Sequence, residues 1–343
     1  MSARGACSLG ARMSSNAIPR SLMAVAALSV LAIGVGAAAK TGFERPSENE
    51  RLRAIGNLFE EPEELRPLYQ PGEEFAPITL PGRGDWLTYH RETGQTFDEY
   101  RESGANRPDD YRKVIYLLPL GEFPEEESPP LAELRDYAAA FFQLEVRIMP
   151  AYHPHALEFG PRDNEQTGRR QLHSPSILAW LQKRLPPDAY CLLGVTMEDL
   201  YPSPSWNYVF GQASLDERVG VYSFARYDPA FFGRGRPASW RDTALRRSCK
   251  VLAHETAHMF GLPHCIYFDC VVNGANHLDE SDAQPQHACP VCLRKLRHAA
   301  GFDPVRRYDQ LRDFYRSRRW YEEADWVGRQ LALVRPPGPA AQP

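Results

Sequence analysis

The sequence has no region in which charge of one sign accumulates. Its 40 basic and 44 acidic residues are mixed along 343 residues and leave a formal net charge of -4. Nucleic-acid binding usually needs a basic surface, so we expect no nucleic-acid partner. The sequence also has no internal repeat. Only one uncharged run, residues 21–39, approaches the ~20 residues needed to cross a bilayer, which excludes a multispan membrane protein.

The composition is that of a folded protein. Hydrophobic residues make up 43% of the chain, and its length suffices for one full core and a smaller second one. The charge balance does not identify a partner. We expect a monomer.

The uncharged run near the N-terminus predicts an export signal. Arg4, Arg12 and Arg20 precede it, and it ends in alanines 37–39, where cleavage would fit. Its length also suits an uncleaved membrane anchor. The first interpretation makes the protein periplasmic or secreted, and the second leaves it anchored to a membrane by its N-terminus. Both place the rest of the chain outside the cytoplasm.

Three regions follow this predicted signal or anchor, which spans residues 1–39. Residues 40–110 are rich in Glu, Arg, Pro and Gly and have scattered apolar anchors, which predicts an extended segment packed on the main domain. The main domain is expected at 111–305. Residues 306–343 are expected to form a C-terminal helix and a disordered, proline-rich tail.

Short apolar or alternating runs in the main domain predict strands at 114–118, 144–149, 189–196 and 218–227, and 206–213 is a further apolar and aromatic segment. Apolar residues spaced three and four apart predict helices at 131–142, 174–185 and 242–262. Ser174 is the expected N-cap of the second helix, with Pro175 at its first position. Strands interleaved with helices indicate an α/β (α+β) fold with a sheet.

The last of these helices contains the pattern that is richest in chemistry. His254 and His258 are four residues apart and therefore share one helical face, where both imidazoles can reach one ion. Glu255 can reach a water on that ion without binding the metal itself. Gly261 ends the helix, because glycine enters left-handed backbone conformations at little cost, and the turn brings His264 round as a third ligand.

This arrangement predicts hydrolysis. Three neutral imidazoles leave a zinc ion with an open fourth position, where the pKa of bound water falls far below that of bulk water, to about 7. Glu255 would accept that proton, the hydroxide would attack a carbonyl polarised by zinc, and Glu255 would then protonate the leaving amine. The competing interpretation is that the histidines have no metal role and are hydrogen-bonded by neighbouring groups.

Four cysteines follow the histidine motif with the spacing of a zinc site. Cys265 and Cys270 have four residues between them, and Cys289 and Cys292 have two. Four thiolates would close a tetrahedral shell, so this second zinc would be structural and would hold the loop that carries His264. Two disulfides are the alternative, which predicted export favours.

The motif from His254 to Cys265, together with the three later cysteines, resembles that of the archaemetzincins, which are metzincin-clan zinc peptidases. The resemblance continues upstream through residues 194–202, 206–215 and 223–227, and is similar to the eukaryotic branch in particular. It covers roughly residues 85–310 and is strongest at 190–300. Its combined motif is highly specific.

The resemblance implies a metzincin-like twisted mixed sheet above the active-site helix and a small C-terminal subdomain bound by the second zinc. It also implies an edge strand, expected at 218–227, that pairs with an extended peptide substrate. The protein would then be a zinc metallopeptidase with two zinc ions, one catalytic and one structural. An aminopeptidase is one possible form of it.

Two features depart from the family pattern. The family has a methionine beneath the zinc two residues after its second cysteine, where this chain has Val272. Valine is shorter and fills less volume, so a large gain in turnover in a Val272→Met variant would show that this position limits the enzyme. The predicted export signal is the second departure, because the related eukaryotic proteins look intracellular, and that location stays open as an alternative.

Two other functions remain open from the sequence alone. A zinc hydrolase of non-peptide amides or esters would use Glu255 in the same way. A zinc-stabilised binding module with weak or no catalysis is the other alternative, and Val272 is its only support. An intact base beside three intact ligands argues against it.

Overall fold

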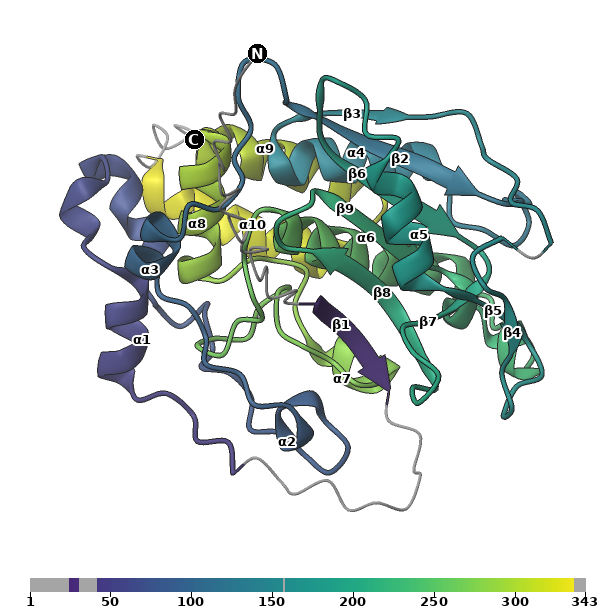
Figure 1. Ribbon diagram of the computed structural model, residues 1–343. Coiled ribbons are helices and arrows are strands. Elements are labelled where there is room, and N and C mark those ends of the chain that lie inside the picture. Colours follow the sequence, from purple (N-terminus) through teal and green to yellow (C-terminus); the bar gives the residue numbers. More distant parts are fainter. Residues whose placement is uncertain (1–24, 31–41, 157, 336–343) are drawn as a thin grey trace, which may run out of the picture.

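The computed structural model describes residues 25–30, 42–156 and 158–335 (Figure 1). Most of the predicted export segment and the proline-rich tail from residue 336 lie outside these ranges. Within them, no helix is both long enough and apolar enough to cross a bilayer.

Helices and strands alternate through the middle of the chain. The strands are β1 (Val25–Val30), β2 (Val114–Leu120), β3 (Glu145–Ile148), β4 (Arg162–Asp163), β5 (Arg170–His173), β6 (Ala189–Thr196), β7 (Asp199–Tyr201), β8 (Tyr208–Ser214) and β9 (Val219–Ser223). The α-helices are α1 (Glu48–Ile55), α2 (Trp86–Tyr89), α3 (Phe97–Glu102), α4 (Leu131–Phe142), α5 (Ser174–Gln182), α6 (Trp240–Met259), α7 (Leu278–Ala283), α8 (Pro290–Ala300), α9 (Pro304–Ser317) and α10 (Tyr321–Val334). Short 3₁₀ helices are η1 (Leu58–Glu60), η2 (Glu63–Tyr69), η3 (Ala225–Tyr227) and η4 (Pro229–Phe232).

Within the described residues, one mixed sheet of nine strands forms the centre of the molecule. Its order is β3-β2-β6-β9-β8-β7-β5-β4, and β1 pairs with β8 outside this path. Strands β3, β2, β6 and β9 are parallel neighbours, while β8 is antiparallel to β9. The α/β fold, predicted from the alternation of elements, and the mixed sheet, implied by the family resemblance, are both confirmed.

The prediction that the edge strand lies at 218–227 is wrong. Strand β9 covers only Val219–Ser223 and lies between β6 and β8, so both of its edges are already paired. The outer edge of β8, opposite β9, is paired antiparallel with β1 along Tyr208–Ser214, whereas β7 makes a single bridge to Val209 on the side of β9. Residues 225–227 form the 3₁₀ helix η3, and β9 is buried throughout.

Successive side chains of each strand point to opposite faces of the sheet, and each face packs into its own apolar layer. Leu192, Val209 and Val221 pack with the inner face of α5, whereas Cys191 and Tyr222 belong to the larger core with α4 and α6. The helix α6 contacts β8 and β9 on that second side. The sheet therefore lies directly against the helix that carries the histidine motif.

The larger core also includes the N-terminal and C-terminal regions. It runs from Ala54 in α1 to Leu331 in α10, and it contains all four cysteines of the predicted zinc site. Helix α1 packs on α8, and α9 packs on α4 (Figure 1). The single C-terminal helix expected from residue 306 is in fact two helices, α9 and α10.

Local predictions differ mainly at helix ends. The predicted helix at 131–142 and the predicted strand at 189–196 coincide with α4 and β6. Ser174, however, is not an N-cap, because the N-cap of α5 is His173. The Ser174 hydroxyl instead donates to the side chain of Gln212 in β8, at 2.6 Å, and so joins the helix to the sheet.

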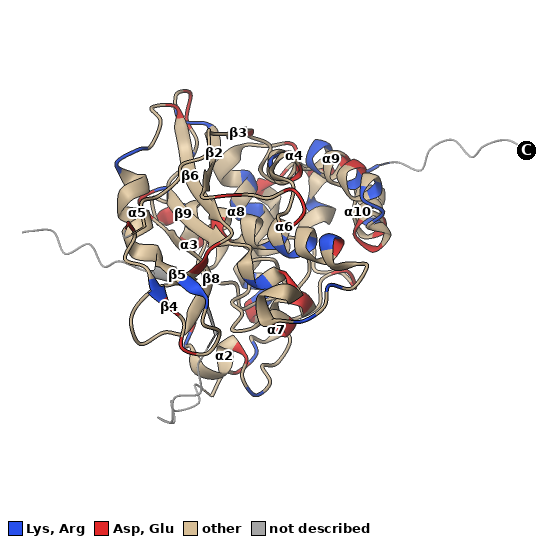
Figure 2. Cartoon of the chain, turned by 90° about the vertical axis from the view of Figure 1, so that its right-hand side faces the viewer, with Lys and Arg blue, Asp and Glu red and all other residues tan. Residues whose placement is uncertain are grey.

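The cartoon in Figure 2 shows Lys and Arg interspersed with Asp and Glu along the helices and loops of the described chain. This view agrees with the mixing of charge along the sequence.

Candidate metal centre

Helix α6 places two of the three predicted histidine ligands. Leu245, Cys249 and Leu252 lie on its buried side and join the larger core, which fixes the rotation of the helix. His254 and His258 therefore project from one face near its C-terminal end. The helix stops at Met259, and Gly261 follows with φ of 79°, in agreement with the predicted helix end.

The turn after α6 returns His264 to the two helical histidines. One ring nitrogen from each of His254, His258 and His264 lies within 4.8 Å of the other two. The Nε2 atoms of His254 and His258 are 2.9 Å apart. All three side chains are buried, with at most 4% of each residue exposed.

The other ring nitrogen of each histidine contacts an acceptor. His254 Nδ1 is 2.9 Å from the carbonyl of Val271, and His258 Nδ1 is 2.6 Å from the carbonyl of Leu262. His264 Nδ1 is 2.7 Å from Oε1 of Glu92. An acceptor at Nδ1 requires the proton to be there, which leaves each Nε2 with a lone pair.

Three convergent lone pairs fit a metal ion. They would repel one another without a cation between them, and His264 Nε2 is buried with no hydrogen-bond partner among the described residues. Burial, followed by the neighbouring histidines, lowers the pKa of His254 well below its usual value and lowers that of His258 to about 3. Neutral imidazoles in a three-histidine set are suitable ligands for zinc.

Glu255 lies beside this cluster and is completely buried. Neither of its carboxylate oxygens has a hydrogen-bond partner within the described chain, and burial raises its pKa well above the usual range. Gly211 of β8 packs directly on it, because a Cβ at that position would lie only 2.4 Å from Oε1 of Glu255. A glycine at position 211 thus lets the β8 backbone approach the carboxylate.

Two further residues of the site come from the N-terminal region and were not predicted as site residues. Glu92 accepts from His264, and Trp86 Nε1 donates to the same oxygen of Glu92 at 2.8 Å. The Trp86 ring also makes an edge contact with His264, with 4.8 Å between ring centroids. Burial alone would raise the pKa of Glu92, but the hydrogen bonds that it accepts from His264 and Trp86 act against burial, and its pKa lies below the usual value.

The four predicted cysteine ligands form a second cluster. Sulfur atoms of Cys265, Cys270, Cys289 and Cys292 all lie within 4.8 Å of one another, and all four residues are buried. The sulfur atoms of Cys265 and Cys289 are 3.6 Å apart, far longer than the ~2.05 Å of a disulfide. All four are free thiols in the structure. The geometry therefore favours the metal-site interpretation over two disulfides.

The turn that holds Val272 connects the two clusters. Val272 is completely buried, its N–H points to the sulfur of Cys270 at 3.4 Å, and its carbonyl accepts from the N–H of Cys265 at 3.0 Å. The preceding carbonyl, that of Val271, is the partner of His254. The position that departs from the family methionine thus belongs to the turn that orients one histidine.

A third group of side chains in the described chain could also hold a metal ion. Asp85, His277 and Glu280 also lie close enough to hold an ion, but Asp85 pairs with His277, and Glu280 accepts the N–H groups of Trp86 and Asn276. These groups satisfy one another and fix the segment before α2 against α7.

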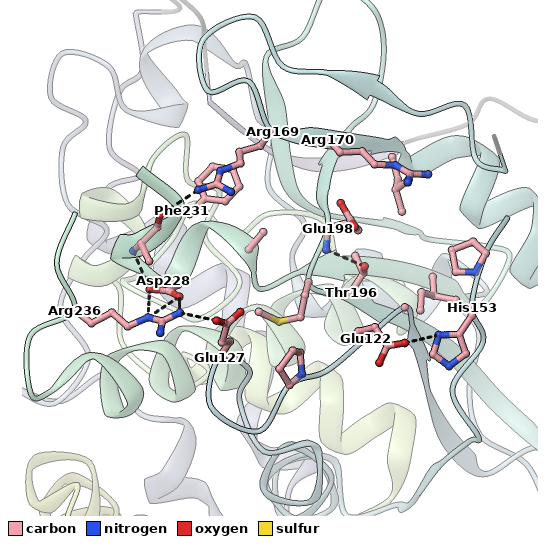
Figure 3. A pocket seen from close by; sticks show the side chains of 18 residues that line it. Glu122, Glu127, His153, Arg169, Arg170, Thr196, Glu198, Asp228, Phe231 and Arg236 are labelled. Carbon is pink, nitrogen blue, oxygen red and sulfur yellow. Dashed lines mark hydrogen bonds and ion pairs between the residues drawn. The ribbon is translucent and has the colours of Figure 1, made fainter. Parts of the chain in front are cut away.

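A cavity of about 560 Å³ lies near the ends of β2 and β6 (Figure 3). Pairs of polar side chains line it: Glu122 lies 3.3 Å from His153, and Asp228 forms an ion pair with Arg236. None of the seven candidate metal ligands is among its lining residues in the described chain. This cavity is therefore distinct from the histidine cluster.

Comparison with known proteins gives consistent matches. The family model described as Peptidase family M54 matches residues 189–298, which include both clusters. Archaemetzincin-2 of Macaca fascicularis is 37% identical over 275 residues, which cover 72% of this chain and 76% of that protein. Archaemetzincin-1 of Homo sapiens is 35% identical over 276 residues, covering 72% of this chain and 55% of that protein. A crystal structure of archaemetzincin from Archaeoglobus fulgidus, complexed with malonate, is 28% identical, covers 53% of this chain and 99% of that one, and has a TM-score of 0.41.

Proposed function

We propose, because this chain belongs to the archaemetzincin family of zinc metallopeptidases, that His254, His258 and His264 hold its catalytic zinc and that Glu255 is its general base. The observation that carries this proposal is the convergence of three buried imidazole nitrogens beside a buried carboxylate without a partner among the described residues. A zinc ion, when bound, supplies Lewis acidity to the scissile carbonyl and acidifies a water in the site.

The protein's own groups then carry the proton. Glu255 accepts a proton from the attacking water and returns it to the leaving amine. Burial suits Glu255 to this exchange, because it raises the affinity of the carboxylate for a proton. The hydrogen bonds at the Nδ1 atoms keep the three imidazoles in one tautomer and orientation.

A peptide substrate would pair with the outer edge of β8. This strand lies directly over Glu255 at Gly211, and an extended peptide added there would run past the histidine cluster. In the structure, β1 occupies this edge along Tyr208–Ser214. A peptide and β1 cannot both use the same N–H and carbonyl groups, so β1 must leave the edge before a substrate can pair.

The cysteine cluster is proposed to hold a second, structural zinc. Four thiolates leave no open position for a substrate or water, which excludes this cluster from the chemistry. Its place within the core, next in sequence to His264, suits a role in fixing the loop of the third ligand.

A peptide panel tests the proposed activity. One sequence would be offered with a free N-terminus, with an acetylated N-terminus and with an amidated C-terminus, to the full chain and to a chain that lacks residues 1–39. We expect hydrolysis of at least one peptide, faster in the shortened chain because the β8 edge is open. Release of the first residue from free N-termini only would identify an aminopeptidase, and internal cleavage of the acetylated peptide an endopeptidase. If neither chain cleaves any of these peptides when loaded with zinc, the proposal is wrong.

A further inference from the structure

The third histidine of the cluster is held differently from the other two. His254 and His258 lie on the rigid helix α6, and their Nδ1 atoms contact carbonyls of neighbouring segments. His264 lies on a loop, and its Nδ1 contacts a carboxylate from a distant part of the chain, that of Glu92. His264, the one candidate ligand that no helix holds in place, is thus the one whose Nδ1 partner is a carboxylate.

We propose that Glu92 is a positioning residue for the metal, which orients His264 and strengthens it as a ligand. A carboxylate that accepts the Nδ1 proton fixes the tautomer with its lone pair on Nε2 and makes the imidazole more basic. Glu92 acts through His264 and does not reach the ion. This inference rests on the proposed metal site of the three histidines.

The contact is built by several groups. Trp86 Nε1 donates to Oε1 of Glu92, the same oxygen that accepts from His264, so the carboxylate is fixed on two sides. Only 20% of the Glu92 side chain is exposed, and 3% of the His264 side chain. A hydrogen bond between these two groups is therefore screened little by solvent.

The segment around Glu92 is also fastened at both ends. Before it, the N–H of Trp86 donates to Glu280 of α7 at 2.9 Å. After it, the ammonium of Lys295 on α8 donates to the carbonyl of Gln95 at 2.5 Å. Gly94 lies so near the loop of His264 that a Cβ there would come within 2.7 Å of Ile266. Glu92 therefore has little freedom to leave His264.

This role extends the metal site beyond the family motif. The family model matches residues 189–298, whereas Glu92 lies about one hundred residues before that region. The N-terminal region of this chain thus supplies a group of the active site in addition to packing on the catalytic part. Loss of such a partner of a metal-bound histidine typically weakens metal affinity 10–100-fold.

The test compares zinc affinity in full-length variants. Glu92→Gln keeps the size and one acceptor oxygen but removes the charge, and Trp86→Phe keeps the ring but removes the donor to Glu92. Glu102→Gln is the matched control, because Glu102 is exposed at the end of α3. Affinity would be measured by competition with a chromogenic chelator, for the ion that is lost in His258→Ala.

We expect Glu92→Gln to weaken the binding of that ion roughly 10–100-fold. Trp86→Phe should weaken its binding less, and Glu102→Gln should leave the affinity unchanged. Co²⁺ bound at the histidine site should change its visible absorption in Glu92→Gln, and the melting temperature of the metal-free protein should stay that of the control. A purely structural role would lower that melting temperature and leave the Co²⁺ spectrum unaltered, which would overturn the inference.

Two failures can be told apart. If the wild-type protein binds no ion that depends on His258, the proposed metal site itself is wrong. If it binds such an ion and Glu92→Gln holds it as tightly as Glu102→Gln does, the metal site stands and the role of Glu92 is refuted.

Discussion

A Glu255→Gln variant is expected to keep its full zinc content and to lose roughly 10²–10⁴ in kcat for peptide hydrolysis, the usual contribution of a general base. Glutamine has nearly the same shape, so it fits the space beneath Gly211, and Glu255 is not one of the three ligands. The substitution replaces the carboxylate by an amide, which cannot accept the proton and return it. Steady-state hydrolysis, with zinc measured on the same samples, checks this prediction.

Glu198→Gln is the matched control for this variant. The pKa of Glu198 is likewise raised, chiefly by burial, but this glutamate is only partly buried and lines the separate cavity of Figure 3. Its replacement should leave kcat nearly unchanged. Equal hydrolysis by Glu255→Gln and the wild-type protein would mean that the activity comes from another site or another base.

A Cys289→Ser variant is expected to lose the structural zinc and much of the stability of the fold. The four sulfurs converge in the core, and zinc bound to such a cluster contributes its binding free energy to folding. Val272 and the sequence neighbours His264 and Cys265 link this cluster to the histidine site. The ion at the histidines should therefore also be held less tightly. Thermal unfolding and zinc analysis of the purified variant check both effects.

Cys191→Ser separates metal loss from the cost of burying a hydroxyl. Cys191 is fully buried in β6, outside the cluster, so its replacement should cost only the ~1–3 kcal/mol of an unpaired polar group and should not alter the zinc content. If Cys289→Ser lowers the melting temperature no more than Cys191→Ser and retains all zinc, the four cysteines do not form a metal site.

The sequence was sufficient to find both candidate ligand sets, since each depends on short spacings. Two histidines four apart in an apolar helix pattern lie on one face whatever the rest of the chain does. Close cysteine pairs are similarly local, and only their mutual approach depends on tertiary structure. The structure brings together all seven residues that these spacings selected.

Longer-range relations could not be predicted in this way. Glu92 and His264 are 172 positions apart, and one glutamate among many in a charged N-terminal region has no pattern that marks it. The wrong prediction of the edge strand has a related cause. Alternation along residues 218–227 indicates a strand, but it does not say which neighbours that strand pairs with, and this choice decided that β8 lies at the outer edge.

The N-terminal region therefore has a larger part in this protein than its composition suggested. Residues 85–95 contact the third histidine through Glu92, α7 through Asp85 and Trp86, and α8 through Gln95. The proposed metal site thus includes contacts from a segment that lies outside the region matched by the family model.

Zinc analysis of the purified wild-type protein and of His258→Ala tests the central claim most directly. His153→Ala is the control, because His153 is exposed and lies at the separate cavity. We expect two zinc ions per chain in the wild-type protein and in His153→Ala, and one in His258→Ala. Equal zinc content in all three proteins would contradict the assignment of His254, His258 and His264 as the ligands of the catalytic ion.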